Sequence, residues 1–229
     1  MTKKPPKYLM TISRLTVDKP GVRLYDRVSA VIAELVANSY DADATVVKIS
    51  APMDQWLASK VGGEIIDKGF KIEVVDDGVG MSPQQINEFY LRVGAERRKD
   101  AKRGDRSEKF KRKVMGRKGV GKLAPFGVCR IIEVISSGGD LVDAPGGGKG
   151  FRTAHLILDR DAIMSDTDEP YEPVPGNLDE TIQAKSGTTL RLSGFGYRHV
   201  PAMVARIFLD VLVAQMPPEA RARVRIDAL

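Results

Sequence analysis

The chain has 229 residues, of which 42% are hydrophobic and 29% charged, with a formal net charge of +6, a composition typical of a globular protein with one large core or two small ones. A single cysteine, Cys129, excludes an internal disulfide and a cysteine-cluster metal site, and with only two histidines besides we expect no zinc centre. Because no apolar run approaches the roughly 20 residues of a membrane span and none follows the charged N-terminus, we expect a cytoplasmic protein without signal peptide or membrane contact.

Three segments are expected in the chain. Residues 1–24 have little internal pattern and are predicted to form an N-terminal arm. Residues 25–216 are predicted to form one domain, with a lid at about residues 94–118. Residues 217–229 begin another strand, so we expect them to start a following segment of a longer protein.

The first helix is predicted over about residues 25–40, and it has two stripes. The apolar stripe, which suits packing on a sheet, consists of Val28, Ile32, Leu35 and Val36. The polar stripe holds Glu34, Asn38 and Asp41 at positions i, i+4 and i+7. Two carboxylates and an amide suit a hard metal ion and a water molecule that needs a base. For a helix taken alone, a solvated polar face is the alternative.

Two predicted strands follow, Thr45–Ser50 and Phe70–Val75. The second runs into the sequence Asp76-Asp77-Gly78-Val79-Gly80-Met81. Glycines at this spacing let the backbone approach a flat ligand, and a carboxylate at a strand end can accept a hydrogen bond from an exocyclic amine. The alternative is an Asp-Gly turn before the next predicted helix, Ser82–Val93, and both interpretations can hold together.

The net positive charge of the chain comes from one segment. Residues 92–122 contain 14 Lys and Arg against 4 Asp and Glu, so the rest of the chain is slightly acidic. Residues 94–118 have few apolar positions, and we expect them to form a mobile lid. A cluster of this sign attracts phosphate, either of a nucleotide or of a nucleic-acid backbone, and charge alone does not choose between the two.

The basic segment leads into a glycine-rich loop, Gly116–Gly121. Glycines that open a helix expose backbone N–H groups at its positive end, which is a ready site for phosphates. The spacing differs from that of a P-loop. The remaining predicted elements are strands at 130–136, 151–158, 187–193 and 224–227, a glycine-rich loop at 138–150, a surface excursion at 159–186 and a helix at 201–216.

The order of these motifs resembles the GHKL superfamily of ATP-binding domains, which includes the DNA gyrase B subunit, the ninety-kilodalton heat-shock chaperone, histidine kinases and MutL. The resemblance covers roughly Asp26 to Ser193. Residues 34–45 are most similar to the MutL helix, and the glycine-rich loop is closer to the chaperone pattern. The resemblance implies an α+β fold of the Bergerat type, a two-layer sandwich with a mixed, mostly antiparallel sheet and helices on one face.

The resemblance also implies a role for each motif residue. Glu34 would be the general base that polarises the attacking water, and Asn38 would bind Mg²⁺. Asp76 would accept a hydrogen bond from the adenine amino group, and Thr188 would support Asp76 and a water on the adenine side. The other implied nucleotide contacts are Asp41, which would orient the end of the helix, Gly80, which would leave room for the base, Met81, and the phosphate-binding residues Gly119, Val120, Gly121 and Lys122.

Two departures from the superfamily pattern concern charged residues. Asp77 stands where many relatives have Asn, and we expect its carboxylate near the nucleotide without touching it. Arg97 and Lys99 lie in the lid where some relatives place a phosphate-contacting cation, but the lid has no secure alignment. A lysine from a following domain is common in the MutL-like branch; if such a lysine is used here, this chain does not contain it.

The resemblance therefore predicts a magnesium-dependent ATPase with slow turnover, in which lid closure gates dimerisation or contacts with a partner. Glu34 favours hydrolysis over kinase activity, because a histidine kinase needs no water-activating base. The alternative function is a nucleotide-gated module that binds nucleic acid through residues 92–122 and has little ATPase activity. A third possibility, a scaffold that keeps the fold without binding ATP, fits poorly with the complete set of motif residues.

Overall fold

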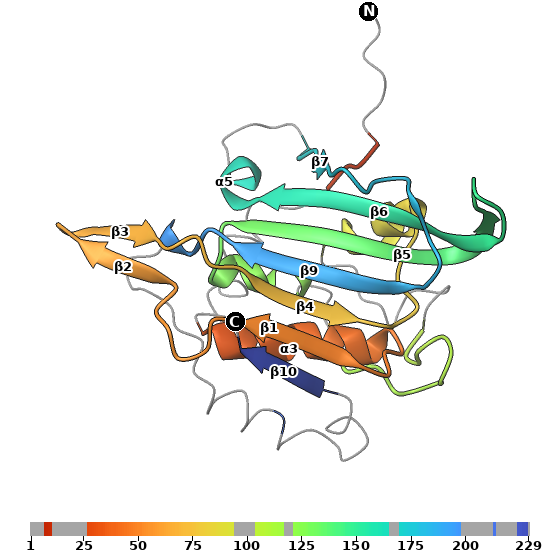
Figure 1. The fold of residues 1–229 in the computed structure, drawn as a ribbon, viewed down its shortest axis with the longest axis horizontal. Helices are drawn as coiled ribbons and strands as arrows, with labels where there is room; N and C mark the ends of the chain where they lie inside the picture. Colours follow the sequence, from red (N-terminus) through yellow and green to blue (C-terminus); the bar gives the residue numbers. More distant parts are fainter. Residues whose placement is uncertain are drawn as a thin grey trace, which may run out of the picture.

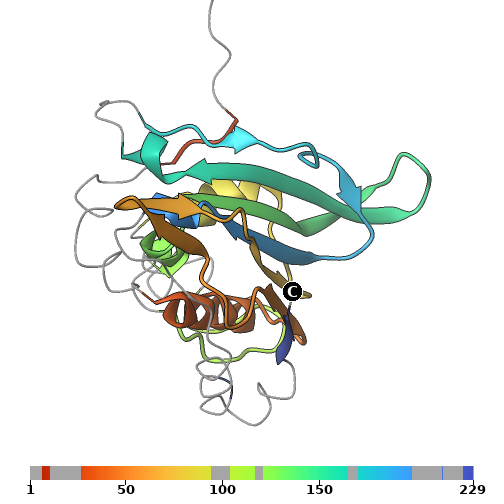
Figure 2. The same cartoon turned by 60° about the vertical axis from the view of Figure 1, so that its left-hand side comes forward.

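The protein folds as a mixed sheet with helices packed against one of its faces. The computed structural model describes residues 7–10, 27–93, 104–116, 121–164, 170–197, 213 and 224–228. Figures 1 and 2 show α3 (Val28–Asp41) and the shorter helices on the same side of the sheet. The predicted α+β class with a mostly antiparallel sheet is confirmed.

Seven strands form one continuous path across the sheet, and all adjacent pairs but one are antiparallel. The exception is the parallel pair of the edge strand β10 with β1. A short strand, β8 (Ile182–Gln183), also pairs with β6. The order is β10 (Val224–Ala228), β1 (Val47–Ala51), β4 (Ile72–Asp76), β9 (Gly187–Ser193), β5 (Ile131–Asp143), β6 (Lys149–Asp159) and β7 (Val174–Pro175).

The β5–β6 hairpin is longer than the sequence predicts. The glycine-rich loop expected at 138–150 is shorter, because β5 continues to Asp143 and only residues 144–148 turn. The prediction is wrong because the glycine pair at 138–139 does not end the strand. A register shift between Gly138 and Leu141 takes the glycines into a bulge, which keeps the ladder paired on either side.

The helices are short apart from α3. The predicted helix at 82–93 consists of α4 (Pro83–Gln85) and the π-helix η1 (Ile86–Tyr90), and it starts with a capping box between Ser82 and Gln85. The other helices are η3 (Gly121–Gly127), α5 (Arg160–Ile163) and η4 (Phe195–Tyr197). The predicted helix at 201–216 lies outside the described residues except for residue 213. No helix in the described ranges is long and apolar enough to cross a membrane.

The core lies between α3 and the sheet. The predicted apolar stripe of α3 is buried, as the helical period requires. It packs with buried residues from β1, β4, β5, β6 and β9, which include Ile49, Val74, Ile132, Val134, Leu156 and Leu192. A separate hairpin of β2 (Ala58–Val61) and β3 (Glu64–Asp67) projects from the domain (Figure 1).

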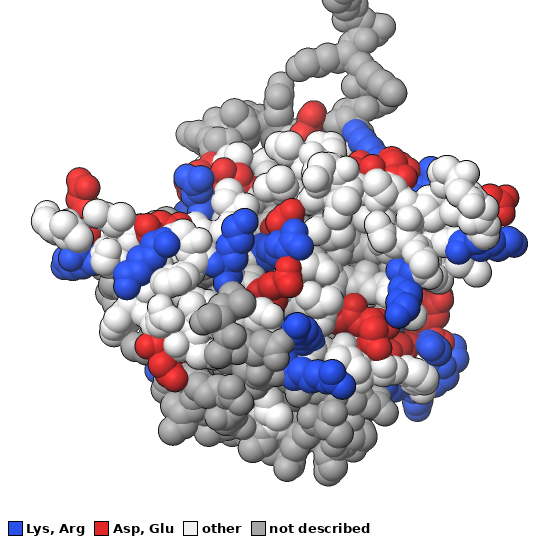
Figure 3. Space-filling model, viewed as in Figure 1, with Lys and Arg blue, Asp and Glu red and all other residues white. Residues whose placement is uncertain are grey.

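The face of the sheet opposite α3 has charges of both signs. Arg191 on β9 pairs with Glu73 on β4 at 2.6 Å and with Glu133 on β5 at 3.5 Å. Figure 3 shows Lys and Arg side chains interspersed with Asp and Glu over this face. The described part of this face therefore lacks the single sign of charge that attracts a polyanion.

Both predicted flanking segments contain residues that belong to the domain. Tyr8 and Met10, within the predicted arm, are 1% exposed and join the main core. Met10 pairs with Tyr171, and the Tyr8 hydroxyl donates a hydrogen bond of 2.6 Å to Asp179. At the other end, β10 extends the edge of the sheet beside β1. These pairings are long-range, so local pattern does not reveal them.

Asp179 anchors the N-terminal segment, and its pKa predicts how stability depends on pH. Burial acts to raise this pKa, but hydrogen bonds from Lys7, Tyr8 and the backbone of His155 outweigh burial and lower it below 3.8. The folded state therefore favours the ionised carboxylate, whose stabilising effect is present above the unfolded pKa and is lost as pH falls through the folded pKa.

We predict that Asp179→Asn lowers the free energy of unfolding by about 1–3 kcal/mol at neutral pH, because charge-assisted hydrogen bonds weaken. The difference from wild type should shrink as pH falls below about 4. Urea unfolding across this pH range measures both effects. Asp143→Asn, at an exposed position, is the control and should match wild type. A deficit that stays constant with pH would contradict the assignment.

Candidate functional site

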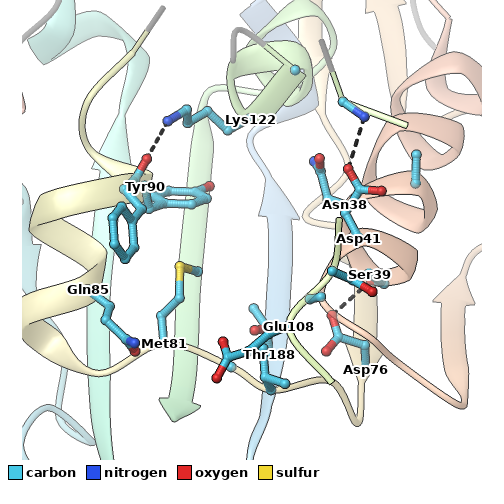
Figure 4. Close-up of a pocket in the computed structure, with 18 of the residues that line it drawn as sticks. Asn38, Ser39, Asp41, Asp76, Met81, Gln85, Tyr90, Glu108, Lys122 and Thr188 are labelled. Carbon is cyan, nitrogen blue, oxygen red and sulfur yellow. Dashed lines mark hydrogen bonds between the residues drawn. The ribbon is translucent and has the colours of Figure 1, made fainter. Parts of the chain in front are cut away.

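One cavity of about 1330 Å³ lies between α3, the end of β4, η1 and the start of η3. This volume is larger than that of most small-molecule sites. Figure 4 shows side chains from these elements around the cavity. Nine of the predicted site residues line it: Glu34, Asn38, Asp41, Asp76, Gly80, Met81, Gly121, Lys122 and Thr188. The other two, Gly119 and Val120, lie outside the described residues, as do Arg97 and Lys99.

The polar stripe of α3 forms one wall of the cavity. Glu34, Asn38 and Asp41 all line it, as their spacing on a helix requires. Glu34 lies against the backbone at the start of η3, where a methyl group on Gly121 would overlap its carboxylate. A glycine at position 121 therefore lets the carboxylate and the glycine-rich loop approach each other closely.

Asp41 holds the chain that enters the glycine-rich loop. Its two carboxylate oxygens accept hydrogen bonds from the backbone N–H groups of Met115 (2.8 Å) and Gly116 (2.9 Å). The side chain is buried, with 5% of the residue exposed. Asp41 thus fixes the start of the glycine-rich loop against the end of α3. The sequence predicts only that Asp41 orients the end of the helix.

Residues 104–116 dock on the C-terminal end of α3. The Arg112 guanidinium donates hydrogen bonds to the carbonyl oxygens of Tyr40 (3.4 Å) and Ala44 (3.0 Å), and the Lys109 N–H donates to Asp43 at 2.5 Å. A cation at a helix C-terminus satisfies carbonyls that have no partner in the helix. The sequence predicts a mobile lid here, because the segment has so few apolar residues. In the structure, these polar contacts dock residues 104–116 on α3 in place of apolar burial, and the mobility of the lid stays a prediction.

Asp76 ends β4 at the opposite side of the cavity floor. Its carboxylate accepts hydrogen bonds from the Ser39 hydroxyl (2.8 Å) and the Gly78 N–H (2.9 Å), with a further one from the Thr188 backbone. Burial raises the pKa of Asp76, and these hydrogen bonds offset only part of that rise. Ser39 was not among the predicted site residues, because its partner on β4 is 37 residues away.

Asp77 points away from the cavity. Its carboxylate accepts hydrogen bonds from the Thr45 N–H (2.6 Å), the Thr45 hydroxyl and the Val46 N–H (2.7 Å). Burial acts to raise its pKa, but these hydrogen bonds outweigh burial and lower it. Asp77 therefore joins the end of β4 to the chain that leaves α3.

A hydroxyl pair supports the loop after β4. The Met81 N–H donates to the Ser136 hydroxyl at 2.9 Å, and the hydroxyls of Ser136 and Thr188 share a hydrogen bond of 2.9 Å. Gly80 has a positive φ of 62° and lies directly against the backbone of Ser137 on β5. The structure thus gives Gly80 a second reason to be glycine, besides the predicted room for a base.

Lys122 bridges the start of η3 to the end of η1. Its ammonium donates hydrogen bonds of 2.7 Å to the carbonyl oxygens of Phe89 and Arg92. Figure 4 shows the Lys122 side chain extended across the top of the cavity toward η1. The predicted contribution of its charge to phosphate binding is compatible with this position, because Lys122 also lines the cavity.

Two comparisons with known proteins bear on this site. A family model described as "Histidine kinase-, DNA gyrase B-, and HSP90-like ATPase" matches residues 25–189, well over half of the chain. A protein of Herpetosiphon aurantiacus named "Putative type II restriction enzyme HgiDII" is 35% identical over 129 residues. The match covers 56% of this chain and 18% of that protein, so the relative is much longer than the part it shares.

The packing of Gly80 on β5 yields a test of the cavity floor. We predict that Gly80→Ala lowers the free energy of unfolding by about 3–5 kcal/mol, because the new methyl group meets the Ser137 backbone as well as a strained φ. Gly147→Ala is the matched control. Gly147 also has a positive φ, of 88°, but open space surrounds it, so only about 1–2 kcal/mol should be lost. Equal losses in urea unfolding would refute the packing argument.

Proposed function

We propose that this chain, which belongs to the histidine kinase-, DNA gyrase B- and HSP90-like ATPases, binds ATP with Mg²⁺ in the cavity and hydrolyses it. The family match across residues 25–189 supports ATP binding. The observation on which the finer proposal depends is a single contact. The hydrogen bond between Ser39 on α3 and Asp76 on β4 places the polar stripe and the strand-end carboxylate around one cavity.

In this proposal the nucleotide lies with its base over β4 and β9 and its phosphates toward η3. Asp76 accepts a hydrogen bond from the adenine amino group through a carboxyl oxygen. Gly80, Met81 and Thr188 line the same end. The phosphates reach the start of η3, where Gly121 lies against Glu34. Two glycines support this orientation. Gly80, at the base end, packs against the Ser137 backbone, and Gly121, at the phosphate end, packs against the Glu34 carboxylate.

The donor set suits magnesium bound together with phosphate. Within the described ranges there is no group of three or more His, Cys, Asp or Glu that could hold a metal ion without other ligands. Mg²⁺ needs no such group, because it takes few protein ligands and completes its coordination with waters and substrate phosphates. The Asn38 side-chain oxygen would hold it, and the ion would supply neutralisation of phosphate charge.

Glu34 would act on the attacking water. In the proposed step a carboxylate oxygen of Glu34 accepts a proton from water as the water attacks the terminal phosphate and the bond to ADP breaks. Phosphoryl transfer depends on positioning and on charge stabilisation more than on covalent catalysis, so a fixed Glu34 beside Gly121 fits this role. Residues 104–116 would gate the reaction and contacts with a second copy, because they are anchored at the end of the same helix.

We predict that Glu34→Gln slows phosphate release by about 10²-fold or more, while the affinity for a non-hydrolysable ATP analogue changes little, because the amide cannot accept the proton. Asn38→Ala should weaken binding of the analogue in the presence of Mg²⁺ and have little effect in EDTA. Phosphate release and calorimetric titration measure these effects. Glu64→Gln, at an exposed position on β3, is the control. Wild-type rates in Glu34→Gln would exclude Glu34 as the base.

A second candidate function, nucleic-acid binding, is favoured by the surface of the docked loop. Lys109, Lys111 and Lys113 are exposed there, and Phe110 between them is 43% exposed. Lysines beside an exposed aromatic ring suit phosphates and an unstacked base. The relative named as a restriction enzyme points in the same direction. In this alternative, nucleotide binding controls the loop and the ATPase activity is low.

If this second function holds, Lys109→Gln with Lys113→Gln should weaken binding of a single-stranded oligonucleotide. The slope of log affinity against log salt should fall by about 0.7 for each phosphate that a lysine no longer neutralises. Neither lysine lines the cavity, so affinity for the ATP analogue should not change. Lys60→Gln with Lys68→Gln, at exposed positions on and beside the β2–β3 hairpin, is the control pair. Fluorescence anisotropy at several salt concentrations measures the slope, and equal slopes for all three proteins would rule out this surface.

A further inference from the structure

Glu108 is a carboxylate in the cavity wall that the nucleotide-binding motifs do not include. It belongs to residues 104–116, which dock on α3, and its side chain lines the cavity. The backbone is fixed on both sides of it. The preceding residue, Ser107, is 1% exposed, and the N–H of the following residue, Lys109, donates to Asp43 at 2.5 Å. The carboxylate of Glu108 is therefore presented to the cavity from a fixed point of the chain.

The turn that contains Glu108 is closed by its own hydrogen bonds. The Ser107 N–H donates to the Arg112 carbonyl at 2.8 Å, and the Arg112 N–H donates to the Ser107 hydroxyl at 2.8 Å. Next to this pair, Arg106 and Lys113 form an antiparallel β-bridge. These contacts hold the turn in one shape, so the position of Glu108 follows from the place where the turn docks.

The turn docks at the junction of α3 with the loop after β4. Asp43, which accepts the hydrogen bond from the turn, directly follows Ala42, and the Ala42 carbonyl accepts the Val79 N–H at 2.8 Å. In Figure 4, Glu108 lies toward the floor of the cavity and Lys122 lies at its opposite end. Glu108 is thus at the end of the cavity proposed for the base, away from the phosphate end.

The chemistry of a carboxylate limits what Glu108 can bind on ATP. An ionised carboxylate only accepts hydrogen bonds. ATP donates hydrogen bonds through the adenine amino group and the ribose hydroxyls, whereas its ring nitrogens and phosphate oxygens are acceptors. The amino group is the proposed partner of Asp76, so the ribose hydroxyls are the donors that remain for a second carboxylate. A carboxylate that binds a ribose hydroxyl is a recurrent contact in nucleotide sites.

We propose that Glu108 binds the ribose hydroxyls and selects ribonucleotides over deoxyribonucleotides. The ribose joins the base to the phosphates, so it must leave the base end of the cavity, where the turn of residues 104–116 is docked. The inference rests on the proposed ATP site and on its orientation. It gives residues 104–116 a direct part in recognition of the nucleotide.

The test uses the full chain with Mg²⁺ and three nucleotides: a non-hydrolysable ATP analogue and its 2′-deoxy and 3′-deoxy forms. Calorimetry gives each affinity. Wild type should bind the ribose form about 5- to 30-fold more tightly than either deoxy form, because a hydrogen bond to a charged acceptor is stronger than one between neutral groups. Glu108→Ala should bring this ratio to about 1. A structural defect or a general change in charge would alter all three affinities by a common factor, so the ratio isolates the contact with the hydroxyls.

Glu108→Gln keeps an acceptor oxygen without the charge, so its ratio should lie between those of wild type and Glu108→Ala. Glu172→Gln, at an exposed position outside the cavity, is the matched control and should keep the wild-type ratio. Equal binding of the three nucleotides by wild type, or an unchanged ratio in Glu108→Ala, would overturn the role of Glu108. So would loss of the ratio in Asp140→Asn alone, at a second carboxylate that lines the cavity. Failure of wild type to bind any of the three would instead overturn the proposed ATP site.

Discussion

The hydrogen bond from Ser39 to Asp76 is the contact on which the cavity depends. It joins the last turn of α3 to the last residue of β4, where the apolar packing of helix on sheet ends. Two further contacts close the same junction: the Val79 N–H donates to the Ala42 carbonyl at 2.8 Å, and Asp77 holds the residues that follow the helix. The apolar core therefore ends at a polar seam, and Ser39 and Asp76 of this seam line the cavity.

The cavity brings carboxylates close to the place proposed for a triphosphate, which would be repulsive if all were unshielded. Asp41 accepts two backbone N–H groups, and Asp76 accepts a hydroxyl and a backbone N–H. Each of these donors stabilises the negative charge and fixes the side chain. The two carboxylates thus act as joints between segments, and their donors offset part of the negative charge that lines the cavity. This division explains how an acidic helix face can line a site for an anion.

Sequence reasoning reached the features that have a local period or spacing. The stripes of α3 follow from the helical repeat, and the loop after β4 follows from Asp and Gly at fixed offsets. The long-range partners could not be predicted, because nothing near Ser39, Ser136 or Asp179 in the sequence indicates which residue each will meet. The same reason explains why no fixed contacts are predicted for residues 104–116. Their anchors, Asp41 and Asp43, lie at the end of a helix that comes much earlier in the chain.

Polar contacts along the cavity face of α3 make this helix the common element of the molecule. Its C-terminal end receives Arg112, the backbone of residues 115–116 and, through Ser39, Asp76, while Glu34 near its middle meets the start of η3. A ligand bound in the cavity would therefore lie against segments that all contact this one helix, beside a sheet whose ladder is continuous from β10 to β7.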